Sequence, residues 1–229
     1  MLIILLPGLE GTGHLFDAFV KCLPAGNHAK VVSYPTASPL SYQELEELVA
    51  RELPTSGKYI IIGESFSGPI ALACGSRSRA DLVAIVLVAS FAYRALGRTG
   101  LLLARLPLSL ICRLPIPDFV LRTFLLGKSA SEDDLSRTRR AIGEVRPQVL
   151  ACRVKEALTS DYGKRQLQPA SRVVAIFPQY DHLLGSASRR SVRQVCPTVE
   201  VEMVPAPHLA LQVAPMAVLT VLKRLGILP

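Results

Sequence analysis

The sequence contains no closely spaced pair of cysteines. Its five cysteines are an odd number spread along 229 residues, and no two of them form a C-x-x-C motif. This spacing argues against a disulfide framework and against a cysteine-bound zinc site. We therefore expect no metal, and we expect most of the cysteines to be small buried hydrophobic residues.

The sequence also has no apolar run of the kind that spans a membrane. A span needs about 20 residues nearly free of charge. The longest hydrophobic region, Leu101–Leu126, is interrupted by Arg105, Arg113, Pro115, Pro117 and Asp118. Met1–Leu6 is apolar but short, and it lacks the basic region of a signal peptide. These absences favour a cytoplasmic protein.

No internal repeat, low-complexity tract or linker interrupts the chain. Half of its residues are hydrophobic (50%), which excludes a disordered chain and a coiled coil. A length of 229 residues suffices for one α/β domain with a substantial core but not for two. We expect residues 1–229 to form a single domain.

Acidic residues are fewer than basic ones, and the formal net charge is +8. Many basic groups fall in two clusters: Arg137, Arg139, Arg140, Arg146 and Arg153, then Arg189, Arg190 and Arg193. The simpler interpretation is solvated helix faces. The alternative is attraction to an acidic partner, either a membrane surface or an acyl carrier protein. A nucleic-acid partner is not expected, because the sequence has no recognition motif.

Six short apolar runs rich in Ile and Val predict β-strands. Most are apolar at successive positions, which is typical of strands buried on both faces of a parallel sheet. The last run differs, because Val and Met alternate with Glu200 and Glu202, a pattern typical of an edge strand. The predicted strands are Leu2–Leu6, Lys30–Tyr34, Tyr59–Gly63, Leu82–Ala89, Arg172–Phe177 and Val199–Val204.

Helical patterns lie between most of these runs. One helix begins at the capping box Ser41–Glu44, another follows Ser65, and the last runs from Pro215 to Gly226. Strands that alternate with helices predict a doubly wound, mostly parallel six-stranded α/β sheet. The gap between Ala89 and Arg172 is too long for one crossover helix. We expect a helical insertion at about residues 94–145, followed by a returning helix at Gln148–Leu158.

The strongest chemical signal surrounds Ser65. An Ile-rich strand ends at Gly63-Glu64-Ser65-Phe66-Ser67-Gly68, and a helix begins immediately afterwards. A serine on such a tight turn presents its hydroxyl at the carboxyl edge of the sheet, as a nucleophile requires. The usual pattern is G-x-S-x-G, and Ser67 here replaces the second glycine. An ordinary strand–helix turn with a capping serine is the alternative interpretation.

A nucleophilic hydroxyl needs a base, and the base needs an acid that orients it. His208 follows the last predicted strand, and Asp181 follows the strand before it. Both loops therefore lie at the carboxyl edge of the sheet, where open α/β folds bind their ligands. Among the other histidines, His14 is the main rival as base, while His28 and His182 are less suitably placed.

The glycine-rich loop Pro7–Gly13 follows the first strand. The N–H groups of Leu9 and Phe66 are the expected donors of an oxyanion hole, which stabilises the negative oxygen of a tetrahedral intermediate. The loop lacks the Lys-Ser/Thr of a P-loop, so it does not predict a nucleotide site. Residues expected to contact the substrate are Glu10, His14, Leu121 and Phe124.

These motifs and their order resemble the α/β-hydrolase superfamily. The similarity rests on Leu6–Gly13, Gly63–Gly68, the Asp181 loop and Pro207-His208-Leu209, and it spans nearly the whole chain. It implies Ser65, Asp181 and His208 in the triad roles and Leu9 and Phe66 as oxyanion donors. The chain begins where the third strand of the superfamily would stand. The resemblance therefore implies a compact sheet without the first two strands.

The resemblance implies a serine hydrolase, and acyl-ester cleavage without a cofactor is its most frequent activity. The apolar insertion is expected to cover the pocket as a lid and to favour apolar acyl groups, or else to pack as ordinary core. Two alternatives stay open. One is a thioesterase that acts on coenzyme A or carrier-protein thioesters, and the other is a non-catalytic binding protein with a hydrolase fold.

Overall fold

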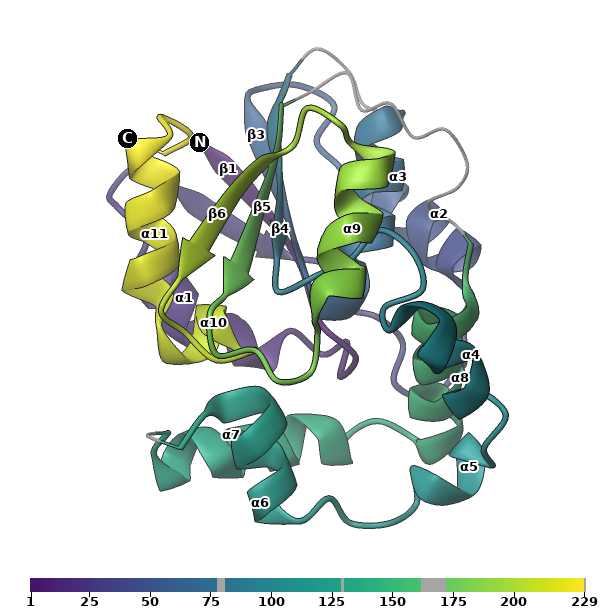
Figure 1. Ribbon diagram of the computed structural model, residues 1–229. Coiled ribbons are helices and arrows are strands. Elements are labelled where there is room, and N and C mark those ends of the chain that lie inside the picture. Colours follow the sequence, from purple (N-terminus) through teal and green to yellow (C-terminus); the bar gives the residue numbers. More distant parts are fainter. Residues whose placement is uncertain (78–80, 129, 162–171, 229) are drawn as a thin grey trace.

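A computed structural model describes residues 1–77, 81–128, 130–161 and 172–228 (Figure 1). Its centre is a six-stranded sheet in the order β2-β1-β3-β4-β5-β6, and every neighbouring pair is parallel. The strands are β1 (Leu2–Leu6), β2 (His28–Val31), β3 (Tyr59–Glu64), β4 (Leu82–Val88), β5 (Arg172–Pro178) and β6 (Glu200–Val204).

All six predicted strands are therefore present, and the doubly wound parallel sheet is confirmed. The central strands β1, β3, β4 and β5 are almost fully buried. In β6 the two glutamates that suggested an edge strand pair with arginines: Glu200 with Arg172 at 2.5 Å and Glu202 with Arg224 at 2.6 Å. β2 is shorter than predicted and begins two residues earlier, at His28.

Helices cover both faces of the sheet (Figure 1). One hydrophobic cluster joins Ile4, Ile61 and Leu87 of the strands to side chains of α2, α3 and α9. The other joins Ile3, Ile60 and their neighbours to α1 and α11. These helices are α1 (Asp17–Lys21), α2 (Tyr42–Glu52), α3 (Gly68–Ser76), α9 (Ser186–Val195), α10 (Ala210–Val213) and α11 (Pro215–Arg224), and η1 (His14–Phe16) precedes α1.

The long connection between β4 and β5 forms the helical segment that the sequence predicted. It contains α4 (Gly97–Leu103), α5 (Leu108–Ile111), α6 (Asp118–Leu121), the π-helical turn η3 (Arg122–Leu126), α7 (Glu132–Gly143) and the returning helix α8 (Pro147–Thr159). The prolines between Leu106 and Asp118 keep its first helices short. Ser131 begins α7 with a capping box, in which its side chain accepts a hydrogen bond from the Asp134 N–H.

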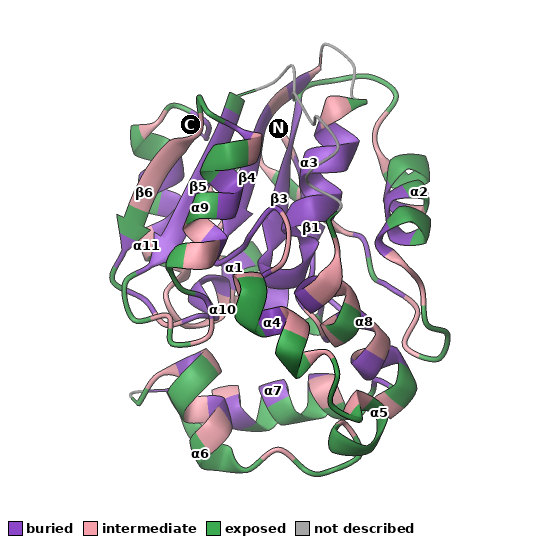
Figure 2. Cartoon of the chain, turned by 45° about the vertical axis from the view of Figure 1, so that its right-hand side comes forward, coloured by how far each residue is buried: buried purple, intermediate pink, exposed green. Residues whose placement is uncertain are grey.

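This insertion lies across the carboxyl edge of the sheet, as Figures 1 and 2 show. A third hydrophobic cluster joins Leu121, Leu126 and Leu135 of the insertion to Leu15 and Leu209 of the sheet domain's loops. The backbone N–H of Leu209 also donates to the carbonyl of Leu125 at 2.9 Å. The insertion is thus attached directly to the loops that end at the sheet edge.

Within the described residues, no helix combines the length and apolar character needed to cross a membrane. All five cysteines are free, and Cys74 and Cys196 are buried.

Candidate active site

The turn after β3 holds Ser65 in a strained conformation. Ser65 has φ 47°, in the left-handed region that non-glycine residues rarely adopt. Its neighbours must be small: a Cβ atom on Gly63 would lie 2.8 Å from the Cβ of Ala71. Ser90 supports the turn by donating a hydrogen bond to the Ser65 carbonyl. The turn therefore presents the Ser65 hydroxyl at the sheet edge, as the sequence pattern indicates.

Ser65, His208 and Asp181 form one chain of hydrogen bonds. The Oγ of Ser65 lies 2.8 Å from Nε2 of His208, and Nδ1 of His208 lies 2.8 Å from Oδ2 of Asp181. The other carboxylate oxygen of Asp181 accepts from the backbone N–H groups of Leu183 and Leu184 at 2.8 and 2.9 Å. The His208 and Asp181 side chains are only 2% and 3% exposed. The acid is therefore held in one orientation, and it fixes the imidazole.

The glycine-rich loop runs beside Ser65. A Cβ atom on Gly8 would lie 3.8 Å from the Cβ of Ser65, so the backbone at Gly8 and Leu9 closely flanks the serine. Leu9 lines the cavity described below, and the Phe66 side chain is buried behind the turn. Of the two predicted oxyanion residues, Phe66 thus directly follows Ser65 in the chain, and Leu9 belongs to the loop that passes beside it.

Arg153 of α8 holds this loop in place through hydrogen bonds to its backbone. Its guanidinium donates to the carbonyls of Leu9, Glu10 and Pro35 at 2.8 to 2.9 Å. Only 2% of the residue is exposed, and its cationic group lies 5.7 Å from the centre of the Tyr34 ring. The sequence interpretation of Arg153 as part of a solvated helix face is therefore wrong. The signal was present, because Arg153 is spaced i+4 from the buried Val149 and i−4 from the buried Ala157.

Ser67, which replaces the usual glycine, links the two loops. Its hydroxyl donates to the carbonyl of Pro7, and Oγ lies 2.6 Å from the hydroxyl of Tyr34. The neighbouring Phe66 ring stacks on Tyr42 with centroids 4.7 Å apart, and the Tyr42 hydroxyl donates to the Phe66 carbonyl at 3.0 Å. The serine therefore adds a bond between the Ser65 turn and the glycine-rich loop that glycine cannot make.

Two buried carboxyl groups flank the site. Glu64 precedes the nucleophile, and burial raises the pKa of its carboxyl to about 8 although Gln212 donates to it at 3.1 Å. Glu10 is 5% exposed, and burial likewise raises its pKa against the opposing effect of hydrogen bonds from Thr12 and Gly13. One oxygen of each carboxyl has no hydrogen-bond partner among the described residues. Glu64 is therefore largely protonated at neutral pH.

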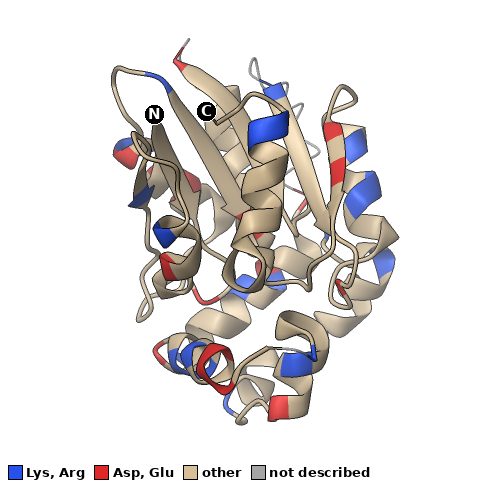
Figure 3. Cartoon of the chain, turned by 90° about the vertical axis from the view of Figure 1, so that its left-hand side faces the viewer, with Lys and Arg blue, Asp and Glu red and all other residues tan. Residues whose placement is uncertain are grey.

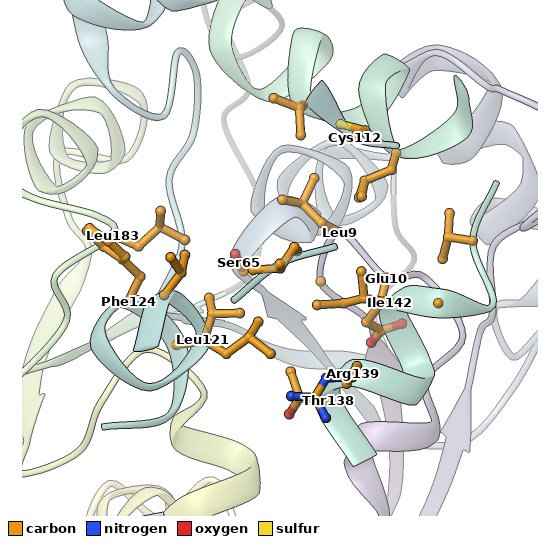
Figure 4. Close-up of a pocket in the computed structure, with 18 of the residues that line it drawn as sticks. Leu9, Glu10, Ser65, Cys112, Leu121, Phe124, Thr138, Arg139, Ile142 and Leu183 are labelled. Atoms are coloured by element: carbon orange, nitrogen blue, oxygen red, sulfur yellow. The ribbon is translucent and has the colours of Figure 1, made fainter. Parts of the chain in front are cut away.

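A cavity of about 680 Å³ opens between the sheet edge and the insertion (Figure 4). Ser65 and His208 lie in its wall, and most of the remaining lining is apolar. The insertion contributes much of this wall, including Ile111, Cys112, Leu114, Val120, Leu121, Phe124, Leu125 and Ile142. Thr138, Arg139 and Arg113 are the polar residues that the insertion adds. The Ser65 side chain thus lies at a largely apolar space.

Three of the four predicted substrate contacts line this cavity: Glu10, Leu121 and Phe124. His14 does not belong to the wall. Its side chain is 66% exposed, and Nδ1 lies 3.3 Å from a carboxylate oxygen of Glu144. The helical turn that begins at His14 buries Leu15 and Phe16 and leaves the histidine outside. The prediction of a substrate contact for His14 is therefore corrected, and so is its candidacy as the base that contacts Ser65.

No group of three or more His, Cys, Asp or Glu side chains suited to a metal occurs in the part of the chain that the structure describes.

Neither a scan against protein-family models nor a search of curated protein sequences found a match to this chain. Solved structures do match it. A carboxylesterase structure from Nitrososphaera gargenis superposes with a TM-score of 0.76, covers 99% of this chain and 89% of its own, and is 14% identical. A thermophilic esterase from Thermogutta terrifontis has a TM-score of 0.73, covers 99% and 89% of the two chains, and is 15% identical.

The similarity extends to proteins with other activities. The enol-lactonase from Burkholderia xenovorans has a TM-score of 0.73, covers 98% of this chain and 91% of its own, and is 15% identical. At such identities the likeness concerns the arrangement of the chain, and the chemistry must be argued from the side chains.

Proposed function

The chain has the α/β-hydrolase fold, and on that premise we propose that it is a serine hydrolase that cleaves carboxylic esters with apolar acyl groups. The fold is that of known esterases and of an enol-lactonase, which supports hydrolytic chemistry in general terms. The observation that carries the specific proposal is the continuous hydrogen-bonded chain Ser65–His208–Asp181, with its serine in the wall of an apolar cavity.

In the proposed reaction, Ser65 Oγ attacks the ester carbonyl while His208 Nε2 takes the hydroxyl proton. Asp181 stays ionised and stabilises the resulting imidazolium. The N–H groups of Leu9 and Phe66 donate to the negative oxygen of the tetrahedral intermediate. His208 then returns the proton to the departing alcohol, which leaves an acyl group on Ser65. Water, activated by the same histidine, releases the acid.

The cavity supports the choice of substrate. Its wall is mostly apolar, and its volume of about 680 Å³ falls within the range of small-molecule sites, roughly 300–1,000 Å³. Apolar acyl chains gain free energy from burial in such a space, whereas sugars and highly charged groups lose hydrogen bonds to water there. We propose further that the insertion is the cover of this cavity within a single domain.

Ser65→Ala tests the nucleophile. We expect it to abolish labelling by a fluorophosphonate probe and to reduce turnover of p-nitrophenyl butyrate by several orders of magnitude, about 10⁶-fold in well-studied triads. Ser56→Ala, in an exposed turn before β3, is the matched control. Near-normal turnover by a folded Ser65→Ala protein would overturn the assignment, and absence of labelling in the wild-type protein would favour a non-catalytic binder.

The thioesterase alternative requires a second comparison. Rates on p-nitrophenyl esters and on acyl-coenzyme A thioesters of equal acyl length separate the two activities, because only the leaving group differs. We expect kcat/KM to be higher for the oxygen esters. A clear preference for the coenzyme A thioesters would replace our proposal with the thioesterase.

A further inference from the structure

The outer side of the insertion exposes large hydrophobic side chains. We call the rim surface the exposed apolar residues of α4, α5, α6 and the segments between them. Its members are Leu102, Leu103, Leu106, Leu110, Ile111, Leu114 and Phe119, which are 64, 42, 48, 56, 44, 67 and 69% exposed. Figure 2 shows this region as a largely exposed end of the molecule. Large apolar side chains exposed in this number along residues 102–119 favour a surface that another molecule or a membrane covers.

Up to Pro117 the same segment carries arginines and no acidic residue, whereas α6 begins with Asp118, which pairs with Arg139 of α7. No Asp or Glu occurs between Asp81 and Asp118. Arg98, Arg105 and Arg113 are exposed, and no carboxylate within residues 1–77, 81–128, 130–161 or 172–228 pairs with any of the three. Elsewhere, acidic residues lie beside many of the basic ones (Figure 3). The rim surface therefore combines apolar side chains with uncompensated positive charge.

The combination of apolar and positively charged side chains favours one of three possible binding partners: a second copy of the chain, an acidic protein or an anionic bilayer. A second copy of the chain, docked symmetrically, would place both sets of three arginines against each other and repel. An acidic protein would satisfy the arginines but would not require so many exposed leucines. A bilayer with anionic headgroups satisfies both, because arginine binds phosphate groups while Leu and Phe enter the acyl boundary below them.

The cavity is continuous with this surface. Ile111 and Leu114 are 44 and 67% exposed, and both also line the cavity, as does Arg113. Cavity wall and rim surface are therefore formed by the same stretch of chain.

We propose that the rim surface docks the protein on a lipid bilayer that carries anionic headgroups, so that the cavity opens towards the membrane. The leucines and Phe119 insert into the interfacial region, and Arg98, Arg105 and Arg113 contact lipid phosphates. The docking is peripheral. It does not depend on the proposed hydrolase activity, and it holds equally for a protein whose Ser65 is inactive.

Vesicle co-sedimentation tests the proposal in the Ser65→Ala background, so that hydrolysis cannot alter the lipids. We expect binding to vesicles of phosphatidylcholine with about one third phosphatidylglycerol, and much weaker binding to phosphatidylcholine alone. Replacing Arg98, Arg105 and Arg113 together by Gln should weaken binding to the anionic vesicles by about fivefold per arginine, up to about 100-fold in all. High salt should weaken the wild-type binding in the same direction.

A second variant tests the apolar part. Leu102→Ser, Leu110→Ser and Phe119→Ser together change exposed residues outside the cavity wall. We expect them to lower binding to anionic vesicles by about tenfold or more per side chain that is fully buried in lipid. An unchanged melting temperature shows that the variant is folded. When the same three substitutions are made in the protein that retains Ser65, turnover of a water-soluble short ester should stay at the wild-type level.

Matched controls remove the same groups elsewhere. Lys21→Gln, Lys58→Gln and Lys223→Gln remove three exposed charges, and Val20→Ser, Met203→Ser and Met216→Ser remove exposed apolar groups. Both control variants should bind the anionic vesicles like the wild type. Equal losses in control and rim variants would overturn the proposal. The proposal would also be overturned if the protein did not bind vesicles, or if it bound an acyl carrier protein but not vesicles. A dimer in solution that dissociates when Leu102, Leu110 and Phe119 are replaced by Ser would overturn it as well.

Discussion

At the scale of single residues, Arg153 has a larger part in the site than its distance along the chain from Ser65 suggests. A buried guanidinium that donates to three carbonyls is costly to replace, because each carbonyl would be left without a partner. Two of those carbonyls belong to Leu9 and Glu10, so Arg153 holds the backbone that carries the Leu9 N–H, the proposed oxyanion donor. It acts as a positioning residue through the loop.

Arg153→Met tests this role. The variant keeps most of the side-chain volume but lacks the donors, so the loop should shift and kcat should fall by up to about 100-fold, the cost of a misplacement near 1 Å. KM for an apolar ester should change little, because the cavity wall is elsewhere intact. Fluorophosphonate labelling should slow in parallel with kcat. Lys155→Met on the exposed side of α8 is the control.

A purely structural role for Arg153 predicts a different outcome. In that case the melting temperature would fall, but kcat measured well below it would stay at the wild-type value.

Asp181 offers a second test at this scale. Asp181→Asn preserves the shape of the side chain and its bonds from Leu183 and Leu184, but it no longer selects the histidine tautomer that accepts the Ser65 proton. We expect kcat to fall by roughly 10⁴ while the fold is retained. Asp118→Asn, which removes an exposed carboxylate of α6, should leave kcat unchanged. A comparable loss at Asp118 would refute the role assigned to Asp181.

Residue patterns predicted part of this site and missed the rest. Ser65, Asp181 and His208 could be paired because each follows a recognisable strand, and parallel strands place their ends together. Ser67 was visible only as a departure from a motif, since its partners Pro7 and Tyr34 lie on loops that the sequence does not connect. His14 was misplaced because the direction of a side chain at the first turn of a helix depends on what packs beneath it.

At the scale of secondary-structure elements, the insertion combines two functions that the sequence treated as alternatives. Leu121 is 1% exposed and belongs to a hydrophobic cluster, so it is core, yet it also contributes to the cavity wall. Phe124, on the π-helical turn, is 40% exposed and lines the cavity. Phe124 is therefore the better position for changing the cavity without unfolding the insertion.

Acyl-chain dependence measures the contribution of this element. A buried methylene contributes about 0.8 kcal/mol, so kcat/KM for p-nitrophenyl esters should rise by up to about fourfold per added carbon over the first several carbons. Phe124→Asp should flatten that slope with a small change in melting temperature. Phe119→Asp is the control, because Phe119 is exposed outside the cavity wall.

A strict preference for acetate that Phe124→Asp leaves unchanged would show that the acyl group lies elsewhere. The insertion would then contribute only to the hydrophobic core, and the proposed preference for apolar acyl groups would be wrong.

The elements themselves were predictable to different degrees. The strands were predicted within a few residues because continuous Ile and Val runs have few alternatives, and α2 and α7 began at their capping boxes. The short helices α4, α5 and α6 could not be separated from the sequence. Their apolar residues have no single period, because some face the cavity and others face outwards.

At the scale of the whole molecule, the buried carboxyl of Glu64 links stability to pH. Its pKa is about 8 in the folded protein and near the ordinary value of 4.5 when the chain is unfolded. Between these values the folded state binds more protons than the unfolded state, so the free energy of unfolding falls as the pH rises. Glu10, whose pKa is also raised by burial, contributes in the same direction.

Glu64→Gln should remove part of this dependence. The amide matches the neutral carboxyl in shape and carries no charge at any pH, so the variant and wild type should melt alike near pH 4.5. Above pH 8 the variant should melt at the higher temperature. Glu47→Gln on the exposed side of α2 is the control. A difference in melting temperature between wild type and Glu64→Gln that stays the same at every pH from 4.5 to 9 would contradict this account.

The hydrogen bond from the Leu209 N–H to the Leu125 carbonyl has a consequence for timing. Leu209 is the immediate neighbour of the proposed base, and Leu125 belongs to the proposed cover. If the cover swung away, the backbone beside His208 would lose its anchor in the same movement. Opening of the cavity and loss of alignment of His208 would then be coupled. The protein would be inactive while the cavity is open and would become active only when the insertion closes over a bound substrate.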